Sequence, residues 1–240
     1  MSYLKITPGV SRISSAGRIL HPVVYNIKSE TKEKIFERDN HTCRYCGFKS
    51  AKYNEVNFIA QAHKDKKNPR KDMVLDNYAT ACCFCYQSMH LEKIDRMQSG
   101  ALIWLPEIGQ AALNHICRAI YVARISRGPM ADAAKDSLEA LLARKEEAKK
   151  RLGTDSPKML ASILMEFLEL KEYKLREEKL KGFCILPLDK RIVQEGELEF
   201  NQFPQMLAYW RSKDGPFGSF PPGDWAKSFF EVQEKIKKAA

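Results

Sequence analysis

Long apolar runs are absent from this 240-residue sequence. No stretch approaches the ~18 consecutive apolar residues that a membrane-spanning helix requires. Near Met1 there is also no positively charged segment followed by an apolar stretch, which is the pattern of a secretory signal. Both absences predict a protein of the cytoplasm, a compartment in which thiols stay reduced.

Cysteine is scarce, and its number, seven, is odd. Four of the seven nevertheless form two Cys-x-x-Cys pairs, Cys43 with Cys46 and Cys82 with Cys85. Such a pair presents two thiolates to one metal ion, and two pairs complete the tetrahedral shell that structural Zn²⁺ prefers. The sequence therefore predicts a closed, structural zinc site with these four ligands.

Cys83 is an alternative ligand, because it directly follows Cys82 in the second pair. Only Cys82 has the two-residue spacing to Cys85, so we assign the ligand role to Cys82. The competing interpretation is that these are ordinary buried cysteines or disulfides. That interpretation requires two Cys-x-x-Cys spacings to occur in one chain by chance.

Acidic residues are fewer than basic ones, 30 against 40, and the net charge is +10. Such an excess suits a nucleic acid or an anionic protein partner. Much of it lies in residues 64–71 and 144–151. In the second stretch Glu147 precedes Arg151 by four positions, a spacing typical of a solvated helix face.

The composition, 44% hydrophobic and 29% charged, is that of a globular chain. We predict an α+β fold in which residues 1–104 form a zinc module with an N-terminal arm. Residues 105–185 form a mainly helical region. Residues 186–240 form an aromatic and proline-rich segment with a short final helix from Asp224 onward.

Three helices are predicted in the central region. An apolar stripe from Leu113 to Ala123 indicates the first, which ends before Gly128 and Pro129, and the second runs from about Met130 to Leu152 and stops at Gly153. The third begins with Ser156 as its cap and ends near Gly182. We expect it to bury Leu160, Ile163, Leu164, Phe167 and Leu168.

The 35 residues between the cysteine pairs follow the order of a zinc-bearing HNH endonuclease. A strand at residues 55–59 precedes a basic loop at 62–72, a Leu-x-Asn sequence ending at Asn77, and a Cys-x-x-Cys helix. In HNH enzymes this ββα hairpin carries a second, catalytic metal. A strand histidine serves there as the general base.

The catalytic residues of such an enzyme are missing here. Phe58 occupies the position of the general base, and a phenyl ring accepts no proton. Asn57 replaces a charged metal ligand, and Tyr86 follows the last cysteine where a ligand is expected. A nuclease would have to use His63 or His90 instead. A nucleic-acid binder that does not cut would use Lys64, Lys66, Lys67, Arg70 and Lys71.

Four sequence strings together resemble one family: KIFERD (34–39), TCRYCGF (42–48), TACCFC (80–85) and LIWLPE (102–107). This is the IcmJ family, also called DotN, of the Dot/Icm type IVB secretion system. The resemblance is dense over residues 30–125 and weakest after Leu188. It implies an HNH-like fold without nuclease activity, with zinc on Cys43, Cys46, Cys82 and Cys85.

The resemblance also implies partners. Members of the family bind the C-terminal tail of the coupling ATPase, DotL, at the cytoplasmic face of the inner membrane. The assembly includes DotM and the IcmS–IcmW adaptor and recruits effector proteins for export. We therefore expect a zinc-stabilised adaptor that is not an enzyme and does not insert into the membrane.

Overall fold

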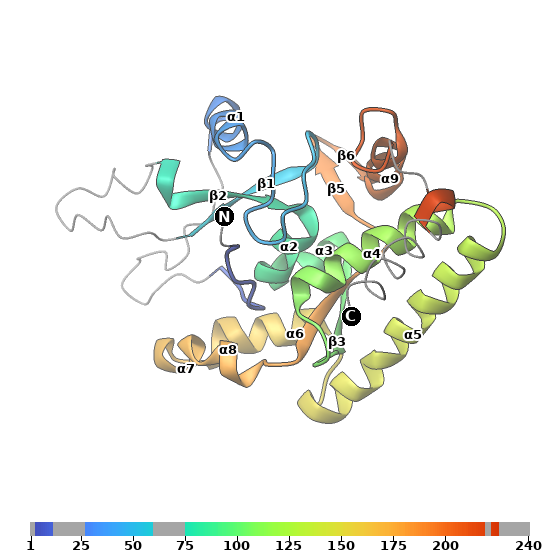
Figure 1. The fold of residues 1–240 in the computed structure, drawn as a ribbon. Helices are drawn as coiled ribbons and strands as arrows, with labels where there is room; N and C mark the ends of the chain where they lie inside the picture. Colours follow the sequence, from blue (N-terminus) through green and yellow to red (C-terminus); the bar gives the residue numbers. More distant parts are fainter. Residues whose placement is uncertain (1–2, 12–26, 60–74, 219–221, 226–240) are drawn as a thin grey trace, which may run out of the picture.

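The computed structural model describes residues 3–11, 27–59, 75–218 and 222–225. These form an α+β fold in which short antiparallel sheets are surrounded by helices, so the predicted fold class is confirmed (Figure 1). No helix in these ranges has both the length and the apolar content that crossing a bilayer requires.

The elements of the described residues have the following bounds. The strands are β1 Asn54–Phe58, β2 Tyr78–Cys82, β3 Gly100–Trp104, β4 Phe183–Pro187, β5 Ile192–Glu195 and β6 Leu198–Asn201. The α-helices are α1 Ser29–Arg38, α2 Cys83–Met89, α3 Ile94–Met97, α4 Gln110–Arg124, α5 Pro129–Leu152, α6 Pro157–Ser162, α7 Leu170–Lys174, α8 Arg176–Lys179 and α9 Phe203–Arg211. Short turns of other helix types are η2 Leu75–Asn77, η3 Leu91–Lys93, η4 Ile163–Phe167 and η5 Pro222–Asp224.

The predicted strand between the cysteine pairs is β1, which pairs antiparallel with β2. The chain then passes directly from β2 into α2, so two strands and a helix follow one another as a ββα unit. Val56 lies opposite Thr80 in this hairpin, and Val56 packs with Ile35 of α1. The basic loop at 62–72, with His63, lies outside the described residues.

Asp39, which follows α1, joins three parts of this unit. Its carboxylate accepts two hydrogen bonds of 3.0 Å from Arg38 and one of 2.8 Å from the Thr80 backbone N–H. Arg44, between the first two cysteines, lies 3.4 Å away. Burial opposes ionisation, but these hydrogen bonds outweigh it and lower the pKa of Asp39.

A second sheet, β3–β4, was not predicted. Leu102 lies opposite Ile185, and both side chains are fully buried. The sheet pairs β3, at the end of the expected zinc module (residues 1–104), with β4 at residues 183–187. The expected boundary between the helical region and the C-terminal segment, after residue 185, falls within β4. The division into three regions stays a prediction.

Helices α4 and α5 match the sequence-based expectation closely. Pro129 opens α5, and Gly153 ends it with φ +75°, a left-handed conformation in which glycine is favoured. On α4 the expected stripe is buried at Leu113, Cys117, Ile120 and Ala123, whereas Ile116, which was expected in the same stripe, is 41% exposed. The two helices pack against each other on one side of the molecule (Figure 1).

The prediction of a continuous third helix is wrong. Ser156 caps α6 as expected, with its hydroxyl 3.3 Å from the Met159 N–H. After Ser162, however, the chain makes a π-helical turn and becomes extended at Leu168. A capping box between Glu169 and Glu172 then starts α7. This start signal competes with continuation of the helix.

The change of helical phase also overturns part of the burial prediction. Leu160 and Leu164 are buried as expected, and Leu168 is partly buried. Ile163 is instead 37% exposed and Phe167 74% exposed. An apolar surface therefore faces solvent where core was expected.

The aromatic C-terminal segment packs onto the residues around the two cysteine pairs. Trp210 of α9 is buried, and its ring makes edge contacts with Phe48 and Phe84 at 5.9 and 5.7 Å. The β5–β6 hairpin and α9 were not predicted. The final helix expected after Asp224 lies outside the described residues.

Replacing Asp39 with asparagine should destabilise the protein by about 1–3 kcal/mol, because buried hydrogen-bond donors lose a charged acceptor. The folded pKa is lowered, so this stabilisation is complete above the unfolded value of ~4 and is lost as pH falls through the folded value. Urea unfolding measures the free energy of unfolding of Asp39→Asn and of wild type, and the difference between the two should shrink below about pH 4. Asp76→Asn is the matched control, since Asp76 has a side chain 75% exposed and 3.9 Å from Arg38. An equal effect of both substitutions would contradict the role of Asp39.

Candidate metal centre

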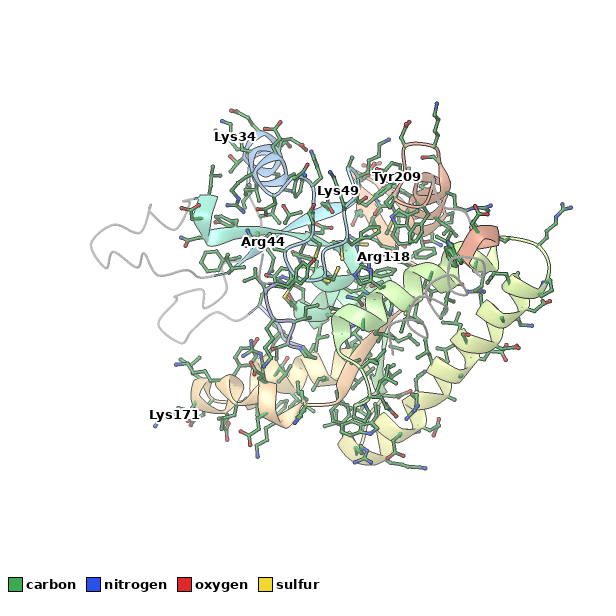
Figure 2. The ribbon with its side chains drawn as sticks, in the orientation of Figure 1. Lys34, Arg44, Lys49, Arg118, Lys171 and Tyr209 are labelled. Carbon is green, nitrogen blue, oxygen red and sulfur yellow. The ribbon has the colours of Figure 1, made fainter. Side chains whose placement is uncertain are left out.

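The two predicted cysteine pairs meet in the interior of the protein. The sulfur atoms of Cys43, Cys46, Cys82 and Cys85 all lie within 4.8 Å of one another, and all four residues are buried. The first pair lies in the turns between α1 and β1, and the second spans the junction of β2 and α2. Arg118, which Figure 2 labels, lies 2.7 Å from the Cys82 sulfur and 3.9 Å from that of Cys46.

The spacing of the sulfur atoms fits one tetrahedral metal ion. The Cys46 and Cys82 sulfurs are 3.7 Å apart. With metal–sulfur bonds of about 2.3 Å, the edge of a tetrahedron is about 3.8 Å, whereas a disulfide bond measures about 2.05 Å. All seven cysteines are free thiols. The four residues can therefore hold a metal ion and leave no open coordination position.

Local backbone geometry forms this site. Gly47, at φ +76°, closes the first turn, and its N–H donates to the Cys43 carbonyl at 2.9 Å. A Cβ atom on Gly47 would lie 2.6 Å from the Tyr3 hydroxyl, and the positive φ strains any residue that has a side chain. Cys82 caps α2, and its sulfur accepts from the Cys85 N–H at 3.4 Å.

Cys83 is buried beside the cluster but is not one of its four members. Burial raises its pKa to about 12. The same cause raises the pKa of Cys117 to about 12 and that of Cys184 to about 11, so these three stay protonated at neutral pH. Within the cluster the pKa of Cys46 is lowered, chiefly by the hydrogen bond from Cys43.

Helix α4 supplies donors to the cluster that sequence analysis missed. Arg118 donates from Nη2 to the Cys82 sulfur at 2.7 Å, and Asn114 donates from Nδ2 to the Cys85 sulfur at 3.3 Å. Gln110 supports Asn114 by donating to its Oδ1 at 2.9 Å. Buried polar residues at positions 110, 114 and 118, each four apart on an otherwise apolar helix face, were the available signal.

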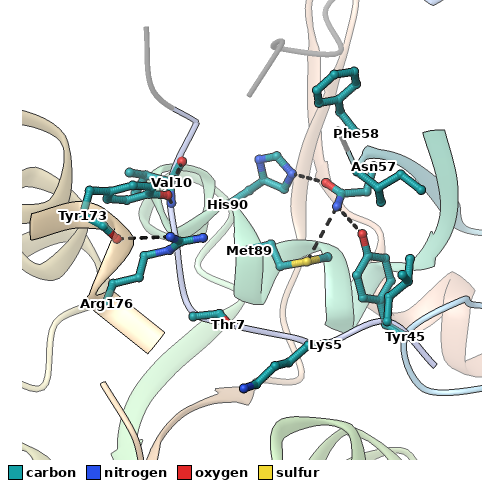
Figure 3. Close-up of a pocket in the computed structure, with 13 residues that line it drawn as sticks. Lys5, Thr7, Val10, Tyr45, Asn57, Phe58, Met89, His90, Tyr173 and Arg176 are labelled. Carbon is teal, nitrogen blue, oxygen red and sulfur yellow. Dashed lines mark hydrogen bonds between the residues drawn. The ribbon is translucent and has the colours of Figure 1, made fainter. Parts of the chain in front are cut away.

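The position of the expected nuclease centre is also buried. His90 bonds through Nε2 to Asn57 Oδ1 at 2.8 Å and through Nδ1 to Ser11 Oγ at 3.0 Å, and Asn57 donates to the Tyr45 hydroxyl at 2.5 Å (Figure 3). Tyr86 stacks on the His90 ring at 4.1 Å. Both nitrogens of His90 therefore have protein partners.

The N-terminal residues 3–11 lie across this position. Gly9 accepts from the Leu91 N–H at 2.9 Å, and the Tyr173 hydroxyl bonds with both backbone groups of Val10, at 3.1 and 2.8 Å. A cavity of about 210 Å³ remains between this segment, β1 and the end of α2 (Figure 3). Residues 3–11 form no helix or strand.

Removal of the metal should unfold the expected zinc module, residues 1–104, because structural zinc in small modules contributes on the order of 10 kcal/mol of apparent binding energy. Calorimetry with and without a strong chelator should show a large fall in melting temperature. An unchanged melting temperature after complete metal removal would contradict a structural centre.

The ligand assignment makes a separate prediction. Cys82→Ser should lose bound metal and be strongly destabilised, whereas Cys83→Ser should keep one metal ion per chain and lose little stability. Elemental analysis of the purified variants measures this directly. Metal loss from Cys83→Ser alone would reverse the assignment.

Comparison with known proteins agrees with the sequence resemblance. No protein-family model matches the chain. Over 185 residues it is 30% identical to the type 4 apparatus protein DotN of Legionella pneumophila subsp. pneumophila (strain Philadelphia 1). The aligned part covers 75% of this chain and 80% of that protein. The chain therefore belongs to the DotN (IcmJ) family.

Proposed function

We propose that this protein is a non-catalytic, zinc-stabilised adaptor of a type IV secretion coupling complex. It binds the C-terminal tail of the DotL-like coupling ATPase and supports effector recruitment together with subunits like DotM, IcmS and IcmW. It acts on the cytoplasmic side of the inner membrane. Membership in a family whose Legionella protein is named as a type 4 apparatus protein supports this role.

Zinc is the metal that this site suits best. Four thiolates at tetrahedral spacing are the donor set of structural zinc sites. Such a shell has no position for water or substrate, so the ion stabilises the fold and takes no part in a reaction. We assign Cys43, Cys46, Cys82 and Cys85 as its ligands.

The engagement of both His90 nitrogens at the nuclease position is the observation that carries the non-catalytic assignment. Catalysis needs a base within hydrogen-bond reach of an attacking water. His90 is buried, and both of its nitrogens are engaged. Asn57 is a neutral side chain bonded to His90 and Tyr45, and the Phe58 ring packs on Tyr78 at 5.5 Å. An HNH-like hairpin has here become a structural unit.

An exposed apolar surface supports the adaptor role. Ten large hydrophobic side chains are exposed in the described residues, and six of them lie between positions 159 and 175. These six, which we call the 159–175 surface, are Met159, Ile163, Met165, Phe167, Leu170 and Leu175. A cavity of about 420 Å³ beside them is lined mainly by leucine and isoleucine. Ile163 and Leu175 of this surface line the cavity. Exposed apolar side chains gathered in one segment suit a protein interaction site, and we assign an amphipathic segment of the ATPase tail to this one.

Phe167→Asp should weaken binding of the ATPase tail by about tenfold or more. Burying an exposed Phe contributes about 1.5–3 kcal/mol, and a charge would also be desolvated. Calorimetric titration with the purified tail measures the effect. Leu198→Asp is the matched control, because Leu198 is 64% exposed on the β5–β6 hairpin, away from the 159–175 surface. Equal weakening by both variants would refute this docking site, and no binding by wild type would refute the proposed partner.

Absence of nuclease activity is tested separately. Supercoiled plasmid incubated with the protein and Mg²⁺ or Mn²⁺ should remain uncut, because the hairpin residues that the structure describes, 54–58 and 78–90, offer no free base. Cleavage that disappears in His63→Ala or His90→Ala would overturn the non-catalytic assignment.

A further inference from the structure

Arg118 is a buried cation without a carboxylate partner. Its side chain on α4 has no exposure to solvent. No Asp or Glu in the described part of the chain forms an ion pair with it. Its Nε and Nη1 atoms make no hydrogen bond, and Nη2 is directed at the Cys82 sulfur, 2.7 Å away, with Cys46 at 3.9 Å.

Aromatic rings hold this guanidinium against the sulfur cluster. Its central carbon lies 4.0 Å from the ring centre of Phe48 and 5.0 Å from that of Phe84. Cation–π attraction strengthens when the cation is desolvated, as it is here. Trp210 of α9 packs on both rings and so holds them in place beside the guanidinium.

The charge balance of the metal centre explains why a cation is needed there. Four thiolates around a divalent ion retain two negative charges, and a buried charge is costly unless an opposite charge and hydrogen bonds accompany it. Arg118 is a permanently charged side chain in contact with the cluster, and its planar, weakly hydrated group suits burial better than lysine.

We propose that Arg118 is the counter-ion of the four-cysteine centre and slows the release of its metal. The guanidinium offsets one of the two retained charges, and its hydrogen bond to Cys82 keeps that sulfur in place on the ion. This inference rests on the zinc site of the proposed function and is independent of the partner.

Metal release from purified full-length protein, followed with a coloured chelator in excess, tests the proposal. Arg118→Met keeps an apolar chain between the two rings but removes the charge, and Arg118→Lys keeps the charge but loses the planar group. Arg124→Gln is the matched control on the same helix, where Arg124 makes a surface pair with Asp189 at 3.0 Å. Mutation of a residue that hydrogen-bonds to a metal ligand typically lowers metal affinity by 10- to 100-fold.

The expected order of release rates is wild type and Arg124→Gln slowest, Arg118→Lys intermediate, and Arg118→Met fastest by about tenfold or more. Release from Arg118→Met no faster than from Arg118→Lys would show that packing and not charge matters, and would overturn the proposal. If Arg118→Met does not fold, Arg118→Gln takes its place in the same comparison, since it donates a hydrogen bond without charge.

A spectroscopic measurement separates charge from general loosening. In the cobalt-substituted protein, loss of a cation beside Cys82 should move the sulfur-to-metal charge-transfer band to lower energy in Arg118→Met and leave it unchanged in Arg124→Gln. An unmoved band would refute the counter-ion. Wild-type protein without bound metal would refute the zinc site itself, a result distinct from metal-loaded variants with unchanged release.

Discussion

Convergence of four sulfur atoms is the constraint on which the rest of this structure depends. It joins a turn after α1 to the junction of β2 and α2, segments separated by 35 residues of sequence. The other elements of the module are arranged around this point. Asp39 ties α1 to β2 from one side, and Tyr3 packs onto the Gly47 turn from another.

Helix α4 extends this constraint into the second half of the molecule. Asn114 and Arg118 face the sulfurs, while Gln110 bonds with both backbone groups of Ile185 in β4 at 2.7 Å. One polar face of a helix thus links the metal centre to the β3–β4 sheet. These side chains are buried, and the hydrogen bonds that they form fix how the helix is rotated.

Local signals were enough to predict part of this arrangement. The cysteine spacing indicated the cluster, and Ser156 and Gly153 marked helix ends correctly, because caps depend on neighbouring residues alone. The pairing of β3 with β4 was not predictable in this way, since their residues are about eighty positions apart in sequence. Arg118 was missed for a related reason: polar residues at positions 110, 114 and 118 mark an unusual helix face, but they do not show that the partner is a sulfur on another element.

The interruption between α6 and α7 has a consequence for how this protein can differ from its relatives. In an α-helix each residue turns the chain by about 100°, so a π-helical turn rotates everything after it relative to what came before. Phe167, the last residue of that turn, is 74% exposed. One residue more or fewer in a helix shifts the side chains after it by about 100° around the axis. A change in length within this segment can therefore alter which side chains face solvent, with no change in the kinds of amino acid present.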